Sequence, residues 1–195
     1  DEDVLAATLP GGLGHGREGL YRPYTFSRNG NELALLFRDH RLSDLIGFTY
    51  SRWETARAVD DFLERLVEIG KHNPGGVVTV LLDGENAWEY YPENGYPFLS
   101  SLYRRIADHP ALRLTTPSGA LERAGDRQVL DHIHPGSWIN GNFGIWIGHP
   151  EENAAWDLLA QARAAAASAS PQVAAILTAG GSAAETPADE ETPAG

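Results

Sequence analysis

The stretch VVTVLLDGENAWEYYPENGYPF, residues Val77–Phe98, changes character part-way along its length. Its first six residues are apolar or β-branched, and Asp83, Glu85 and Trp88 follow at once. A nearly continuous apolar run of this length is typical of a strand buried on both faces, as in a parallel sheet. We therefore predict a strand over Val77–Asp83 whose C-terminal end carries acidic and aromatic side chains. In α/β folds, this end of a strand is where functional sites are built.

The segments on either side of this stretch alternate between strand and helix patterns. Ser51 and Glu54 form a capping-box pattern, and apolar residues recur at helical spacing after them. This alternation predicts an α/β fold built from βα units. The expected strands cover residues 32–37, 77–83 and 112–115, and the expected helices cover 51–70, 97–107, a short segment from Ser118, and 150–163.

Both ends of the chain are predicted to be irregular. Residues 1–28 are rich in glycine, with few periodic apolar positions, and are interpreted as a loop. Residues 167–195 have low complexity and are interpreted as a disordered tail. We expect three regions: barrel-type α/β structure over 1–127, a Trp/Gly-rich loop with the start of a helical domain over 128–166, and the tail over 167–195.

The composition is that of a globular protein, with 42% hydrophobic and 22% charged residues. The net charge of −12 argues against nucleic acid and against an anionic membrane surface as partners. With no cysteine, the chain has no disulfide and no thiolate metal site, and we expect a cytoplasmic protein. No methionine occurs either, which leads us to expect a processed or partial chain. The oligomeric state stays open.

Asp83 is the first candidate for chemistry, because an acid at the end of a buried strand can act as a general acid or base. The alternative is an aspartate that caps the following turn. Trp88 and several tyrosines share the loop with Glu85. Aromatic faces stack on sugars and carboxylates bind their hydroxyl groups, so this loop predicts a carbohydrate site in which Glu85 and Trp88 bind substrate. A hydrophobic cluster that pins the loop is the alternative for Trp88.

Three more residues are candidates for substrate binding. Asp39 and His40 follow the first expected strand, and either line the same rim or form a surface salt bridge. Trp138 is expected to face the sugar, because proline and glycine precede it in an exposed turn, whereas Trp146 is expected to pack in the core. The DHIH sequence at 131–134 offers alternate residues on one face, but without a third ligand cluster we expect neither a metal nor another cofactor.

Three long segments of the sequence resemble glycoside hydrolase family 57, which includes α-amylases, amylopullulanases, glucanotransferases and branching enzymes. The segment LLDGENAWEYYPENGYPFLSSLYRRIADHPALRLTTPS resembles the acid/base region of that family. The segments FRDHRLSDLIGFTYSRW and HPGSWINGNFGIWIGHPEENAAWDLL resemble its flanking segments. The resemblance extends from about residue 1 to residue 163, and its motifs occur in the family's order.

The resemblance implies a retaining enzyme on an incomplete (β/α)7 barrel, followed by a helical segment. It places the general acid/base at Asp83 and implies an α-glucan or oligosaccharide as substrate. The family carries its nucleophile on a glutamate in an earlier motif that this sequence does not contain, so we expect a segment of a larger enzyme that is inactive alone. Glu85 is expected to orient Asp83 or bind a sugar hydroxyl. Two alternatives are a non-catalytic carbohydrate-binding relic and a metal-dependent polysaccharide deacetylase-like barrel.

Overall fold

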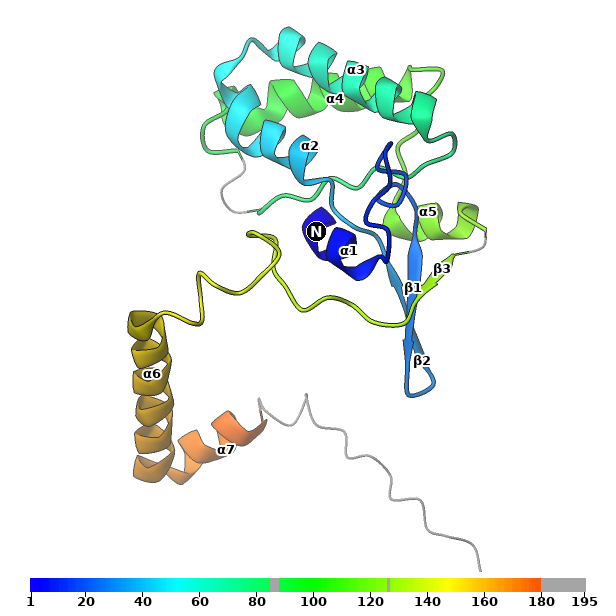
Figure 1. Cartoon of the computed structure of the whole chain (residues 1–195). Helices are drawn as coiled ribbons and strands as arrows, with labels where there is room; N and C mark the ends of the chain where they lie inside the picture. The colour runs from blue at the N-terminus through cyan, green and yellow to red at the C-terminus, as the bar shows by residue number, and fades with distance from the viewer. Residues whose placement is uncertain (85–87, 126, 180–195) are drawn as a thin grey trace, which may run out of the picture. The chain divides into compact units, whose positions relative to one another are not determined.

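The computed structural model describes residues 1–84, 88–125 and 127–179, and the chain divides into two compact units, Asp1–Asn142 and Phe143–Gly195 (Figure 1). The first unit is mixed α/β, as predicted, with a small sheet and several helices. Its elements are α1 (Glu2–Thr8), β1 (Tyr24–Arg28), β2 (Asn31–Leu35), α2 (His40–Asp44), the π-helix η1 (Leu45–Thr49), the 3-10 helix η2 (Tyr50–Arg52), α3 (Thr55–His72), the 3-10 helix η3 (Pro92–Gly95), α4 (Tyr96–Ala107), α5 (Pro117–Arg123) and β3 (Gln128–Leu130).

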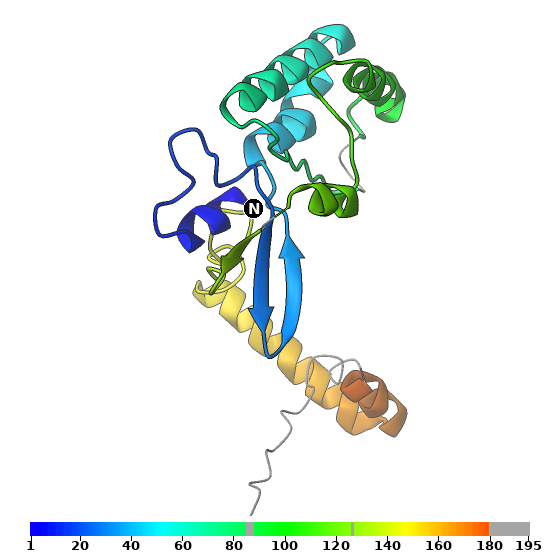
Figure 2. The same cartoon turned by 90° about the vertical axis from the view of Figure 1, so that its right-hand side faces the viewer.

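The sheet of the first unit has the strand order β2-β1-β3 (Figure 2). β1 pairs antiparallel with β2, where Tyr24 is opposite Leu35, and parallel with β3. A two-residue turn joins β1 to β2, and both of its residues, Asn29 and Gly30, have positive φ. Asn-Gly is the sequence that favours such a turn, because both residues tolerate a left-handed backbone. The hairpin therefore follows from local chemistry that the sequence already contains.

The prediction of a loop over residues 1–28 is wrong. The Asp1 side chain accepts a hydrogen bond from the Asp3 amide and caps α1, whose Val4 and Leu5 are buried. Later in the same region, β1 forms a strand of the sheet. The glycine-rich composition of these residues suggested a loop, although they contain a short capped helix and a strand. Around them lies the sheet core, formed by Val4, Leu5, Leu20, Tyr21, Tyr24, Phe37 and Leu130.

The two long predicted helices are confirmed as α3 and α4, which pack side by side (Figures 1 and 2). The predicted start of the first helix at Ser51 is wrong: residues 50–52 form a 3-10 turn, and the Glu54 side chain caps α3 by accepting the Arg57 amide. α5 confirms the short helix expected near Ser118. The apolar faces meet in the helical core, formed by Leu42, Ile46, Tyr50, Ala58, Val59, Phe62, Leu63, Tyr91, Phe98, Leu102 and Ile106.

The segment over residues 77–82 is extended but joins no regular strand ladder. It pairs through single contacts: the Val77 amide donates to the Tyr21 carbonyl at 2.8 Å, and Thr79 forms an isolated parallel bridge with Arg38. The strand expected over 112–115 is likewise unpaired. The two predicted strands are therefore not formed, and residues 77–82 are only partly buried, with Leu81 59% exposed, instead of buried on both faces. The parallel direction expected for 77–83 is present in the single bridge to Arg38. Strand pairing depends on neighbouring segments that the apolar pattern does not identify.

The second unit contains α6 (Pro150–Ala169) and α7 (Pro171–Ala179). The helix expected from Pro150 is confirmed and is longer than predicted. Residues 167–179, expected to be a disordered tail, are instead helical, because this stretch is rich in alanine, the strongest helix former. Residues 180–195 lie outside the described part of the chain. Over residues 1–84, 88–125 and 127–179, no helix combines the length and apolar character that crossing a bilayer would need.

Burial raises the pKa of four tyrosines, Tyr21, Tyr24, Tyr50 and Tyr91, and for two of them a nearby aspartate adds to the effect. In the unfolded chain a tyrosine loses its proton near pH 10. Folding stability from these groups is therefore complete below about pH 10 and falls as the pH rises further.

We predict that tyrosinate absorbance will show four of the seven tyrosines titrating late, together with loss of far-UV circular dichroism. A single smooth titration of all seven near pH 10 with the helical signal intact would contradict this burial.

Candidate active site

The 77–82 segment lies beside residues 38–43, which follow β2 in the sequence. The Asp39 amide donates to the Thr79 carbonyl at 2.8 Å, and the Leu81 amide donates to Ser43 Oγ at 3.3 Å. The two segments run parallel, so their C-terminal ends meet at one edge. Asp83 follows this contact by four positions and is exposed. Glu85 lies outside the described residues.

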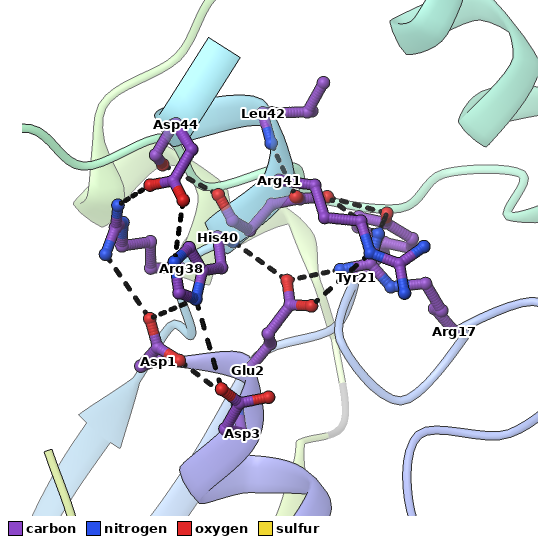
Figure 3. A network of polar contacts seen from close by, with 12 residues as sticks. Asp1, Glu2, Asp3, Arg17, Tyr21, Arg38, His40, Arg41, Leu42 and Asp44 are labelled. Atoms are coloured by element: carbon purple, nitrogen blue, oxygen red, sulfur yellow. Dashed lines mark hydrogen bonds and ion pairs between the residues drawn. The ribbon is translucent and has the colours of Figure 1, made fainter. Parts of the chain in front are cut away.

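Asp39 has no exposed surface and is the centre of a buried polar network (Figure 3). Its side chain accepts the Leu42 amide at 2.9 Å, which caps α2, and the Tyr21 hydroxyl at 2.8 Å. The Arg17 guanidinium lies 3.4 Å away and also pairs with Glu2. Each carboxylate oxygen of Asp39 thus has a partner. Direct contact with a sugar is not available to a side chain buried in this way.

His40 lies at the partly exposed edge of this network, with 31% of its side chain exposed. Its Nε2 is 2.8 Å from Asp44 Oδ2, and its backbone amide donates to Glu2 Oε2 at 2.8 Å. Figure 3 shows the ring between Asp44 and the carboxylates of Asp1 and Asp3. His40 is therefore held in one orientation with part of its surface open, which suits a group that binds a hydroxyl.

Asp1, Asp3 and His40 are also the residues that could together hold a cation, since their ligand atoms lie within 4.8 Å of one another. An arginine pairs with one member of this cluster: Arg38 places Nη1 3.4 Å from Asp1 Oδ2, and its Nη2 lies 2.9 Å from Asp44 Oδ1. The DHIH residues are positioned differently: the His134 amide donates to Thr8 Oγ1 at 2.9 Å and its ring contacts the Gly141 carbonyl.

Trp88 is half-buried and packs against the helical core, with its ring centroid 5.4 Å from that of Tyr91. Gly95, at φ +81°, makes room for this ring: a Cβ there would lie 2.6 Å from Trp88 Cε3. The Tyr91 hydroxyl donates to the Ile46 carbonyl at 2.6 Å. These contacts favour the alternative considered for Trp88, in which a hydrophobic cluster pins the loop after Asp83.

Trp138 is 52% exposed, in a turn organised by the buried Ser137. Ser137 Oγ accepts the Ile139 amide and donates to the Asn142 carbonyl. This turn lies beside α1: the His134 amide donates to Thr8 Oγ1, and a Cβ at Gly141 would lie 3.4 Å from Asp3 Cβ. An exposed indole in a fixed turn is consistent with the role expected for Trp138.

A cavity of about 890 Å³ lies between the 77–82 segment and helices α3, α4 and α5. Its walls are mostly apolar and include Val78, Val80 and Leu82, whereas Asp83 is not among them. The segment therefore contributes apolar side chains to the interior, and the exposed acid follows at its C-terminal end.

Comparison with known proteins identifies the family of this chain. The sequence model described as glycosyl hydrolase family 57 matches residues 3–133. The chain belongs to glycosyl hydrolase family 57. None of the curated proteins matches its sequence. Among solved structures, the 4-alpha-glucanotransferase from Thermococcus litoralis is similar, with a TM-score of 0.54 and 23% identity over 71% of this chain and 20% of that chain. This likeness concerns the fold.

The family 57 match covers Asp83 and the polar network from Asp3 onward, but not Asp1, Glu2 or Trp138. Sequence reasoning missed the partners of that network, Glu2, Arg17 and Tyr21, because the first 28 residues were interpreted as loop. It also missed Phe48, which is 74% exposed in the π-helix η1. The signal for Glu2 was present: acids behind a capping aspartate are typical of a helix start.

We predict that Asp39→Ala lowers the free energy of unfolding by about 3 kcal/mol, because it leaves Arg17 and Tyr21 without a buried partner. The matched variant Asp44→Ala removes a carboxylate that is 39% exposed and should cost less than about 1 kcal/mol. Chemical denaturation of both variants measures the difference. Equal losses would show that Asp39 is not the centre of the network.

Proposed function

We propose that this chain carries the general acid/base of a retaining family 57 enzyme that hydrolyses or transfers α-glucosyl units, and that Asp83 is that residue. The supporting observation is that Asp83 is exposed four residues after Thr79, whose parallel bridge to Arg38 joins two extended segments, and that it lies within the residues matched by the family model. A carboxyl group there can protonate the oxygen of a leaving sugar and then deprotonate water or an acceptor hydroxyl.

A retaining mechanism needs a second carboxylate as nucleophile. We propose that a glutamate upstream of this sequence supplies it, and that Glu85 orients Asp83 or binds a hydroxyl group. The similar glucanotransferase is the reason to keep transfer beside hydrolysis, because in both reactions a covalent glycosyl intermediate is released by a hydroxyl nucleophile.

Substrate recognition is proposed to come from the partly exposed members of the site. His40, fixed by Asp44, would bind a sugar hydroxyl, and Trp138 would stack on a sugar face. Asp39 would act indirectly, by capping α2 and so placing His40. Trp88 would hold the loop in place from its inner side.

The fold around this site is proposed to be part of an incomplete (β/α)7 barrel. In that arrangement residues 1–127 are the C-terminal part of the barrel, and residues 128–166 lead into a helical domain. The parallel bridge between Arg38 and Thr79 supports this proposal, since neighbouring barrel strands run parallel.

The first test uses the polypeptide of the complete reading frame that contains this sequence, with soluble starch and maltoheptaose as substrates. Asp83→Asn should lower kcat by about 10²–10⁴-fold, which is the usual contribution of a positioned general acid/base. Asp108→Asn, an exposed acid after α4, is the matched control and should leave kcat unchanged. Equal activity of the wild type and Asp83→Asn would overturn the assignment.

The second test uses the 195 residues alone. Without its nucleophile a two-carboxylate mechanism loses the covalent step, so this chain should show no measurable turnover on maltoheptaose. Robust turnover that is lost in Asp83→Asn would show that both carboxylates are present here.

A further inference from the structure

Phe48 and Tyr90 are the most exposed aromatic side chains among the large hydrophobic residues of the first unit, at 74% and 78%. They lie far apart in the sequence, on η1 and on the loop that follows Asp83. Single exposed apolar residues are common on protein surfaces. Their importance therefore depends on whether the fold places them together beside the proposed acid.

The hydrogen bond from Tyr91 to the Ile46 carbonyl joins these two segments. Tyr90 directly precedes Tyr91, and Phe48 follows Ile46 by two residues. Tyr91 and Ile46 are both buried in the helical core, with 6% and 3% of their surface exposed. Since the anchors point inward and their neighbours are exposed, Phe48 and Tyr90 lie on the outer side of one fixed junction.

The same junction borders Asp83. Leu82, directly before Asp83, and Trp88, on the far side of the loop, both pack against the helical core that contains Ile46. Leu82, Trp88 and Ile46 also line one cavity. A further link comes from the Leu81 amide, which donates to Ser43 in α2, the helix that leads directly into η1. Asp83 therefore emerges from the same buried cluster as the two exposed rings.

Phe48 is also held in an unusual backbone element. π-Helical turns are rare and are often found at functional sites, because the extra residue displaces a side chain from the regular helical position. The buried Ile46 precedes Phe48 by two residues and the buried Tyr50 follows it by two, whereas Phe48 itself is exposed. The buried neighbours hold the backbone at Phe48 in place before any ligand arrives, which reduces the entropy lost on binding.

We propose that Phe48, together with Tyr90, forms an aromatic platform on which a glucosyl residue of an α-glucan stacks beside Asp83. This inference rests on the proposed function and adds a determinant of substrate binding to it. The chemistry fits the occupant: pyranose rings present apolar C–H faces to aromatic rings, and their hydroxyl groups remain free for His40 and for water. Trp88, a candidate from the sequence, packs instead against the helical core and Tyr91.

The test measures kcat and KM for maltoheptaose with the complete-reading-frame polypeptide. Phe48→Ala should raise KM about tenfold, equivalent to losing one aromatic contact, and should change kcat little. Phe48→Trp restores a larger ring and should restore KM. Tyr103→Ala, an exposed aromatic residue on α4, is the matched control and should leave KM unchanged. Thermal unfolding of each variant checks that the fold is intact.

The outcomes separate this inference from the proposed function. If the wild type acts on maltoheptaose and Phe48→Ala has an unchanged KM, the platform is refuted and the role of Asp83 stands. An equal rise of KM in Phe48→Ala and Tyr103→Ala also refutes the platform. If the wild type acts on no α-glucan, the proposed function fails and the platform fails with it. A rise of KM only in Phe48→Ala, reversed by Phe48→Trp, supports it.

Discussion

The hydrogen bond from the Asp39 amide to the Thr79 carbonyl is the contact on which the arrangement of this site depends. It is the point at which two extended segments, distant in the sequence, come into parallel register. From there one segment continues into α2 and η1, and the other continues to Asp83. A shift in this register would move the acid relative to every other residue of the site, because the Leu81 contact with Ser43 follows from the same alignment.

The side chain of Asp39 stabilises the same junction from the interior. A buried carboxylate is tolerated only when its hydrogen-bonding capacity is filled, and here an amide, a tyrosine hydroxyl and a guanidinium fill it. The network extends outward through Glu2 and Arg17 and ends at His40, where the side chain meets solvent. The charged interior thus orients the partly exposed groups at the edge of the network.

Sequence patterns predicted the mixed α/β class, the long helices α3 and α4, and an acid at the end of an extended apolar segment. These follow from local information, namely apolar periodicity and the composition of short runs. The burial of Asp39 could not be predicted in this way, because it depends on Tyr21, which is distant in the sequence. The packing of Trp88 could not be predicted either, because it depends on the space left by Gly95, which is apparent only in the folded loop. Phe48 was missed for the same reason: its exposure results from a π-helical turn that no periodicity indicates. For the Asn-Gly hairpin and the capped α1, by contrast, the sequence did contain local signals.

The most direct measurement of the central claim, that Asp83 donates the proton in a retaining reaction, is chemical rescue. Asp83→Ala in the complete-reading-frame polypeptide would be incubated with an aryl α-glucoside, whose leaving group needs no proton, and with sodium azide. The account predicts that azide accelerates turnover and that the product is an α-configured glucosyl azide. Azide needs no general base, so it attacks the covalent glycosyl intermediate in place of the water or hydroxyl that Asp83 would deprotonate, in the second of two inverting steps. Unaltered turnover with azide, or a β-configured product, would contradict it.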